Sequence, residues 1–165
     1  MTFAPRTWIV GEVVTAAIMN QEIRDQFNSM FAAWTPYTPA WTSTGTAPVL
    51  SNGTVTGRYM KIGRTVVCFI NLTFGSSTTY GSGNYNLSLP VAAASSGMAM
   101  VGTAHYLGTA RWVGETVISS AASTCSAFFP AGSGDTRTNF MTATLPETLA
   151  SGGQLRLFFV YEAAS

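Results

Sequence analysis

The chain carries little charge: of its 165 residues, 9% are Asp, Glu, Lys or Arg, and the formal net charge is +1. An ordinary soluble domain has about 25% charged residues. With eight basic residues, and Lys61 as the only lysine, the chain lacks the basic cluster that nucleic-acid modules need to neutralise phosphates. Disordered chains combine high charge with few aromatic rings, whereas this one has ten Phe, six Tyr and four Trp. We expect no nucleic-acid partner, an ordered fold and, because weakly charged surfaces tend to associate, a role in an assembly.

Long apolar runs and an export signal are also missing. No run approaches the ~20 apolar residues that cross a bilayer, and the N-terminus lacks a basic region followed by an apolar stretch. We therefore expect no contact with a membrane and folding in a cytoplasm. Cys68 and Cys125, the only two cysteines, each lie in an apolar run that is typical of a strand. A reducing compartment favours two free, buried thiols over a disulfide.

Side chains that could carry catalysis are scarce. His105 is the only histidine, so a Ser-His-Asp or Cys-His arrangement would have to use it. Cys68, His105 and Cys125 are too dispersed for a zinc signature. The carboxylates after residue 36 are also far apart in the sequence, at Glu115, Asp135, Glu147 and Glu162. We expect no enzyme, no metal site and no cofactor.

Residues 15–34 have the spacing of an amphipathic α-helix. Thr15 can cap the helix, and Pro36, preceded by Thr35, ends it because proline cannot donate the next hydrogen bond. Apolar side chains three or four positions apart form one stripe, at Ala16, Met19, Ile23, Phe27, Met30 and Trp34. The stripe can dock on its own domain, or it can pack against copies of itself or another protein. We expect the second.

From Tyr37 onward the pattern is that of β-strands. Around eight short β-rich runs, separated by Gly, Ser and Pro and without intervening helices, predict an antiparallel sandwich or barrel. The fold we expect is mainly β: an N-terminal α-helix followed by an antiparallel jelly-roll-like β-sandwich. Residues 1–36 would form the helical segment and residues 37–165 the sandwich domain.

One β-hairpin is indicated by its turn. The runs Arg58–Ile62 and Thr65–Phe74 are separated by Gly63 and Arg64, a spacing at which glycine supplies a positive φ. The second run has apolar residues on both of its faces, so we expect both faces to be covered. Further strands are predicted at Tyr85–Leu89, Met98–Tyr106, Arg111–Ile118, Cys125–Phe129, Thr138–Thr144 and Leu155–Tyr161.

Aromatic residues assigned to polar, Gly-rich loops have two interpretations. Such rings can stack on the faces of sugars, or they can be core and cross-strand aromatics. The residues concerned are Tyr80, Tyr85, Tyr106 and Trp112.

Two stretches of the sequence carry distinctive motifs. In the first, a Trp-x-x-Gly-Glu-x-Val-Thr-Ala core spans Trp8–Ala16, and Met19-Asn20 and Ile23-Arg24-Asp25 follow it. This stretch resembles the N-terminal segment of short minor tail and fibre-like virion proteins of tailed bacteriophages, especially those of actinobacteria. The second stretch is similar to a β-rich module at the exposed end of such proteins, through Trp41-Thr42-Ser43, residues 57–66, Phe74-Gly75, residues 80–85 and Leu89-Pro90.

The resemblance implies a non-enzymatic virion structural protein that assembles in the host bacterial cytoplasm, as a homotrimer in contact with capsid or tail proteins. It implies that the N-terminal segment anchors the chain to the particle, through Trp8, Gly11, Glu12 and Thr15. Oligomerisation would fall to Met19, Ile23, Phe27, Met30 and Trp34. A minor tail or fibre-like position and a capsid-decoration position both stay open. The alternative is an adhesin tip that recognises a receptor or glycan on the host cell through Tyr80, Tyr85, Tyr106 and Trp112.

Overall fold

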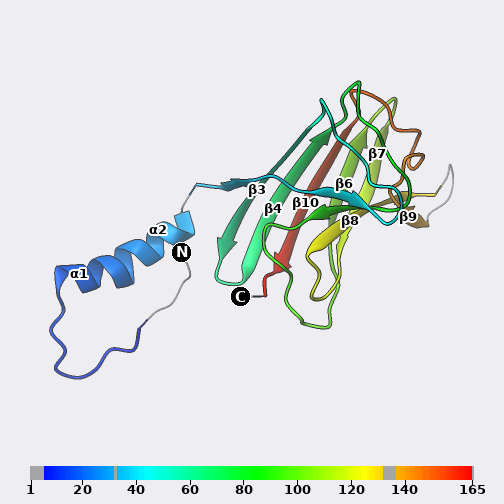
Figure 1. Ribbon diagram of the computed structural model, residues 1–165. Helices are drawn as coiled ribbons and strands as arrows, with labels where there is room; N and C mark the ends of the chain where they lie inside the picture. The colour runs from blue at the N-terminus through cyan, green and yellow to red at the C-terminus, as the bar shows by residue number, and fades with distance from the viewer. Residues whose placement is uncertain (1–5, 32, 132–136, 165) are drawn as a thin grey trace.

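The computed structural model describes residues 6–31, 33–131 and 137–164, which form a helical arm and a β domain (Figure 1). The helical arm contains α1 (Ala16–Met19), the π-helical turn η1 (Asn20–Arg24) and α2 (Asp25–Phe31). The strands are β1 (Thr35–Tyr37), β2 (Trp41–Ser43), β3 (Thr54–Ile62), β4 (Thr65–Thr73), β5 (Tyr85–Ser88), β6 (Met100–Leu107), β7 (Arg111–Ile118), β8 (Thr124–Pro130), β9 (Thr138–Phe140) and β10 (Gln154–Glu162). A mainly β fold with an N-terminal helix is therefore confirmed.

The helix begins where the sequence predicts. Thr15 is the N-cap, and its Oγ1 accepts a hydrogen bond of 3.2 Å from the Ile18 amide. The middle of the helix is a π turn, in which the Asp25 amide donates to the Asn20 carbonyl five residues earlier. The described residues include no helix long and apolar enough to cross a membrane.

The helix ends earlier than predicted, at Phe31, so Trp34 lies outside it. The reason is strand pairing: Thr35–Tyr37 forms β1, and Pro36 lies opposite Arg58 of β3. A residue before proline disfavours the helical conformation, and an edge strand tolerates proline because no ladder bond is lost there.

The strands follow one continuous antiparallel path in the order β1-β3-β4-β10-β6-β7-β8-β5-β2, with β9 beside β8. The sheet curls into a half-barrel, so that β2, β5 and β8 lie across the core from β3, β4 and β10 (Figure 1). Two separate jelly-roll sheets are not confirmed. Local pattern cannot decide this, because it shows which residues alternate but not which strands become neighbours.

The predicted hairpin is confirmed. Ile62 lies opposite Thr65 in the β3–β4 register, and Gly63 in the turn between them has a φ of 58°. Glycine reaches this left-handed region without a steric penalty. β4 then pairs along its whole length with β10, so β3, β4 and β10 are neighbours in one antiparallel register.

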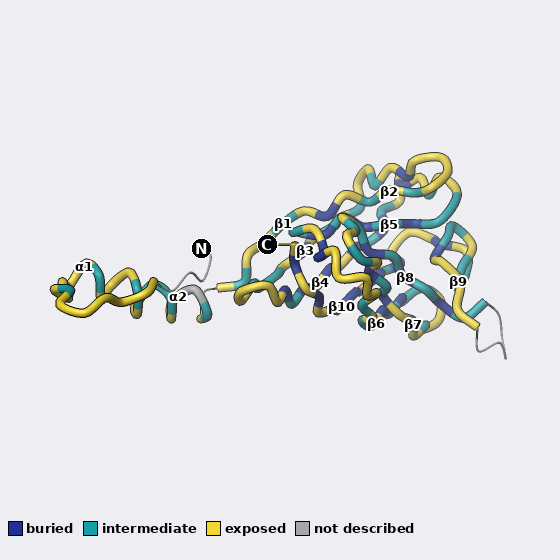
Figure 2. Tube along the Cα trace, turned by 90° about the horizontal axis from the view of Figure 1, so that it is seen from below, coloured by how far each residue is buried: buried dark blue, intermediate teal, exposed yellow. Residues whose placement is uncertain are grey.

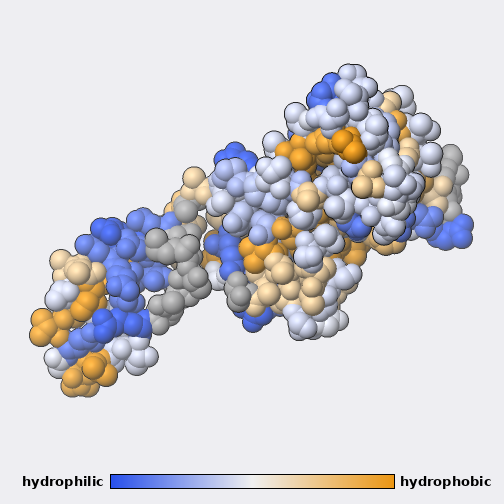
Figure 3. Space-filling model, in the orientation of Figure 1, coloured by the Kyte–Doolittle hydropathy of each residue, from blue (hydrophilic) through white to orange (hydrophobic). Residues whose placement is uncertain are grey.

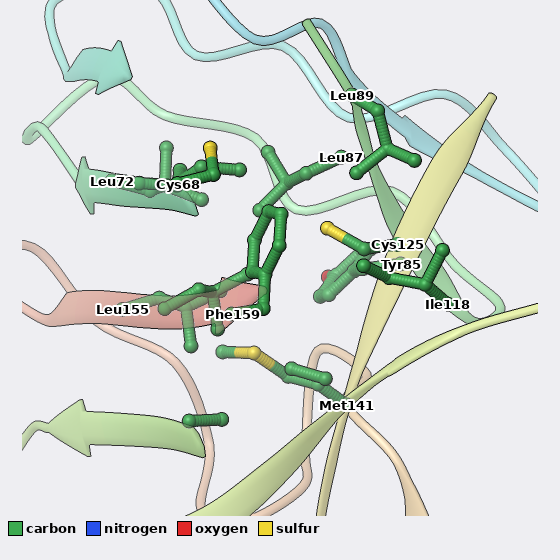
Figure 4. Close-up of a cluster of buried hydrophobic side chains, with 14 of the residues drawn as sticks. Cys68, Leu72, Tyr85, Leu87, Leu89, Ile118, Cys125, Met141, Leu155 and Phe159 are labelled. Atoms are coloured by element: carbon green, nitrogen blue, oxygen red, sulfur yellow. The ribbon is translucent and has the colours of Figure 1, made fainter. Parts of the chain in front are cut away.

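Alternate residues of the central strands fill one core (Figure 4). In β4 and β10 the even-numbered and odd-numbered positions, respectively, face inward, as the period of two requires. Figure 4 shows Cys68 and Phe159 from this layer directed towards Leu87 and Cys125 from β5 and β8. Both cysteines are buried and free, as predicted.

Candidate functional site

A glycine turn shapes the segment before α1. Gly11 has a φ of 85°, and the Glu12 amide donates to the Ile9 carbonyl at 3.2 Å. Few residues other than glycine adopt this conformation readily, which explains the glycine of the Trp-x-x-Gly-Glu core. The Arg6 guanidinium forms an ion pair with the Glu12 carboxylate and lies 5.3 Å from the centre of the Trp8 ring. Three of the predicted anchoring residues, Trp8, Gly11 and Glu12, thus lie together, and the fourth, Thr15, caps the helix.

Two carboxylates lie at the junction of this segment and the helix, and one of them has an oxygen without a hydrogen-bond donor among the described residues. The Arg6 backbone amide donates to Glu22 Oε2 at 3.2 Å. Glu12 Oε2 is buried and has no hydrogen-bond partner in the described part of the chain. Buried polar atoms are normally hydrogen-bonded, because desolvation without a partner is costly. The arm therefore holds an acceptor that its own described residues do not satisfy.

The apolar stripe of the helix faces solvent. Met19, Ile23 and Phe27 are 42%, 44% and 55% exposed. Figure 2 shows the arm projecting from the β domain, and Figure 3 shows hydrophobic residues at its surface beside a hydrophilic face. The first of the two interpretations of the stripe, in which it docks on its own domain, is therefore wrong for these three side chains in the single chain. Their packing against other chains stays a prediction.

The last two stripe residues lie nearer the β domain. Met30 is half-buried. The Trp34 ring packs on the ring of Phe69 in β4, with 5.1 Å between ring centres and a tilt of 48°. Trp34 thereby brings the stripe into contact with the sheet.

The outer face of β3, β4, β10, β6 and β7, which we call the open face, is lined by cross-strand rows. One row contains Met60, Val67 and Val160. The next row, across all five strands, contains Arg58, Phe69, Phe158, Thr103 and Glu115. A third contains Thr56, Asn71, Arg156, His105 and Val113.

The prediction that both faces of β4 are covered is wrong for the single chain. Phe69 is 47% exposed, although Trp34 and Phe158 pack on it, with the Phe158 ring centre at 4.8 Å. The segments that would cover this face, β2, β5 and β8, lie on the other side of the sheet. The sequence signal was apolar alternation on both faces of β4, and the structure leaves one of those faces open.

A hollow of about 380 Å³ lies on the open face. Phe69 and Phe158 are its aromatic lining, and Arg58, His105 and Arg156 bring basic groups to it. Among the residues that the structure describes, no acidic residue lines it. No local pattern in the sequence reveals this group of basic side chains, because only the strand register places Arg58, Arg156 and His105 on one surface.

Two of the four predicted glycan-contact residues are core residues. Tyr85 and Tyr106 are buried, so their rings have no surface to offer a sugar, which corrects their assignment. Tyr80 and Trp112 are half-buried. The Tyr80 ring lies edge-on to Phe74 at 5.2 Å. Alternation along strands places the rings of Tyr85 and Tyr106 inward.

Trp112 takes part in a polar cluster that sequence analysis missed. Glu147 accepts hydrogen bonds from Trp112 Nε1 at 3.0 Å and from the Thr109 amide and hydroxyl, each at 2.7 Å. Burial alone would raise the pKa of Glu147, but these hydrogen bonds, first that of Trp112 and then those of Thr109, outweigh it and lower the pKa. The donors stand 35 and 38 positions from Glu147, too far for any local motif to reveal them.

The Cys68 thiol forms a hydrogen bond with a tyrosine hydroxyl group. Tyr37 Oη lies 3.3 Å from Cys68 Sγ. Burial raises the pKa of Cys68 to about 11, although the hydrogen bond with Tyr37 lowers it. Burial also raises the pKa of Cys125 to about 12, with a smaller contribution from Cys68. Both thiols are thus protonated, unreactive core groups near neutral pH.

The groups considered for catalysis do not form a cluster in the described residues. No group of three or more His, Cys, Asp or Glu in that part of the chain could hold a metal ion. His105 lies on the open face opposite Arg156. Asp135 lies outside the described residues.

Comparisons with known protein families, curated proteins and solved structures give no match. The geometry of the arm and the open face therefore carries the functional argument.

Proposed function

We propose that the chain is a non-enzymatic structural protein of a tailed-bacteriophage virion. It assembles in the host cytoplasm as a homotrimer, attaches to capsid or tail proteins through its N-terminal segment, and displays the β domain on the particle. The exposure of Met19, Ile23 and Phe27 on a projecting helix carries the assembly part of the proposal. The virion part rests on the resemblance of the N-terminal segment and of the β-rich stretch to phage proteins. A helix with one apolar face is stabilised when that face packs against another surface, and each large side chain so buried contributes about 1.5 to 3 kcal/mol.

The N-terminal segment supports attachment. Its turn at Gly11 brings Trp8 and Glu12 together before the helix, and Glu12 Oε2, which has no partner among the described residues, can accept a hydrogen bond from another chain. Exposed apolar side chains flank the turn at Ile9, Val10, Val13 and Val14. A minor tail or fibre-like position and a capsid-decoration position both fit this arrangement. As a finer description of the fold, a jelly-roll-like β domain is supported by the packing of β5 and β8 over β4 and β10.

The mass of the full chain in solution tests the assembly. Sedimentation equilibrium should give three times the 17.4 kDa monomer mass. Replacing Met19, Ile23 and Phe27 together with Gln should shift the protein towards monomer, because the stripe loses its apolar groups. The matched control replaces Gln21 and Asn28, exposed residues of the same helix, with Ala and should leave the trimer intact. A monomeric wild-type chain would contradict the trimer.

Location in the particle tests the rest. Cryo-electron microscopy of intact virions should place the β domain at the outer surface and the N-terminal segment against capsid or tail. Particles assembled with the double variant Trp8→Ala and Glu12→Ala should contain less of the protein, and normal incorporation would refute the anchoring role.

The glycan-binding alternative has less support. Tyr85 and Tyr106 belong to the core, and Tyr80 and Trp112 make internal contacts with Phe74 and Glu147.

A further inference from the structure

We propose that the open face is the surface on which a second copy of this chain packs, with Arg58 of one copy paired with Glu115 of the next. This inference rests on the proposed function and deepens it, because it names the contact surface of the same assembly. Four features of the open face, taken in turn below, carry it.

The first feature is apolar exposure in neighbouring rows. Phe69 and Phe158 are half exposed in one row, Val160 in the row above, and Val101 and Val113 are more exposed still. Scattered apolar residues need no explanation, but contiguous ones mark interaction surfaces. The open face therefore has the composition of an interface.

The second feature is shape. The hollow of about 380 Å³ lies over β3, β4, β10 and β6, whereas β7, at the other side of the face, presents Val113 with 74% of its surface exposed. A copy that lays its β7 across the β3–β4 side of its neighbour brings this side chain to the hollow. One side of the face thus complements the other, as contact between identical chains requires.

The third feature is charge. Arg58 and Glu115 stand at opposite ends of the same row, on β3 and β7. Four strand spacings of about 4.8 Å separate them by about 19 Å, too far for an ion pair within one chain. Neither side chain has an ion-pair partner among the residues that the structure describes. When β7 of one copy lies across β3 and β4 of its neighbour, Glu115 of the first copy comes close to Arg58 of the second.

The fourth feature is continuity with the helical arm. Trp34 packs on Phe69, so the helix stripe and the open face meet at one contact. Copies that associate through their helices therefore bring their open faces close together. The apolar area buried at the helices and the area buried at the open faces then both stabilise the assembly.

Charge reversal in the full chain tests the pairing. Arg58→Glu and Glu115→Arg each bring like charges together, so each should weaken association in sedimentation experiments by about tenfold or more. The double variant restores opposite charges and should associate as the wild type does. Ala47→Glu, at an exposed position in the loop after β2, is the control and should change nothing. Circular dichroism checks that each variant is folded.

The outcomes separate this inference from the proposed function. A monomeric wild-type chain overturns both. A trimeric wild type whose single variants associate normally overturns the open face alone. A third outcome is that Arg58→Glu weakens association, Glu115→Arg does not, and the double variant does not restore it. That outcome overturns the pairing of Arg58 with Glu115 and shows that the basic hollow takes part in another contact.

An equal mixture of the two single variants distinguishes a dimer from a ring of three. In a two-fold dimer with one chain of each kind, both pairs have opposite charges, so the mixture should associate as the wild type does. A ring of three built from two kinds of chain always contains one like-charged pair, so the mixture should stay weaker than the double variant. A mixture that stays weaker than the double variant supports the trimer. A mixture that associates as the wild type does overturns the trimer but leaves the contact between open faces in place.

Discussion

Phe158 and Phe159 are neighbours in β10 but serve opposite faces of the sheet. Phe159 is 1% exposed in the core, whereas Phe158 is 39% exposed and packs on Phe69 of the open face. The two rings have the same chemistry and differ in what surrounds them. Under the proposed contact between open faces, Phe159 stabilises the fold of one chain and Phe158 stabilises the contact between chains.

Replacing each phenylalanine with alanine should therefore have different effects. Phe159→Ala removes a buried ring and leaves a cavity, so it should lower the free energy of unfolding by roughly 3 to 5 kcal/mol. Phe158→Ala should cost the single chain about 1 kcal/mol, the size of one aromatic contact, and should instead weaken association. Urea denaturation at low protein concentration measures the first effect and sedimentation the second. Equal destabilisation by both variants would contradict the assignment of the two faces.

The Glu147 cluster predicts a pH dependence of stability. Its hydrogen bonds lower the pKa of Glu147 in the folded state, so their contribution is present above the pKa of the unfolded carboxyl and is lost as the pH falls through the lowered value. The loss of stability caused by Glu147→Gln should be largest near neutral pH and shrink below about pH 4. Thermal unfolding across this range measures it. Trp112→Phe, which removes one donor, should lose part of the same dependence, and a pH-independent difference would count against the cluster.

The buried thiols predict slow chemistry in the folded protein. Because the pKa of Cys68 is raised to about 11, and that of Cys125 to about 12, a disulfide reagent at about pH 8 should find almost no thiolate. Both thiols should react promptly after denaturation in guanidinium chloride. Cys125→Ala isolates the reaction of Cys68. Rapid reaction of the native protein would show that the core opens.

Alkaline pH should also destabilise the fold. A thiol pKa raised from 9.0 to about 11 contributes stability that is complete below the unfolded value and is lost as the pH rises through the folded one. The midpoint temperature of thermal unfolding should decrease as the pH is raised from about 9 to about 11. Cys68→Ala should make this decrease smaller.

Much of the local structure could be predicted. Thr15 caps the helix and Gly63 turns the hairpin as their residue types require. The end of the helix could not be predicted, because pairing of β1 with β3 draws residues 35–37 into a strand. Contacts such as that of Trp112 with Glu147 were also beyond the sequence, since they join residues far apart in the chain.

The sequence by itself determined the periodicities: apolar residues three and four apart in the arm and alternation in the strands. These follow from the geometry of the helix and the strand, which each residue obeys locally. Only the tertiary structure decided which apolar groups are covered. Strand register places Phe69 beside Phe158, and the curl of the sheet covers one of its faces and leaves the other open. Burial depends on neighbours distant in the sequence, so folding alone distinguishes the core from the open face.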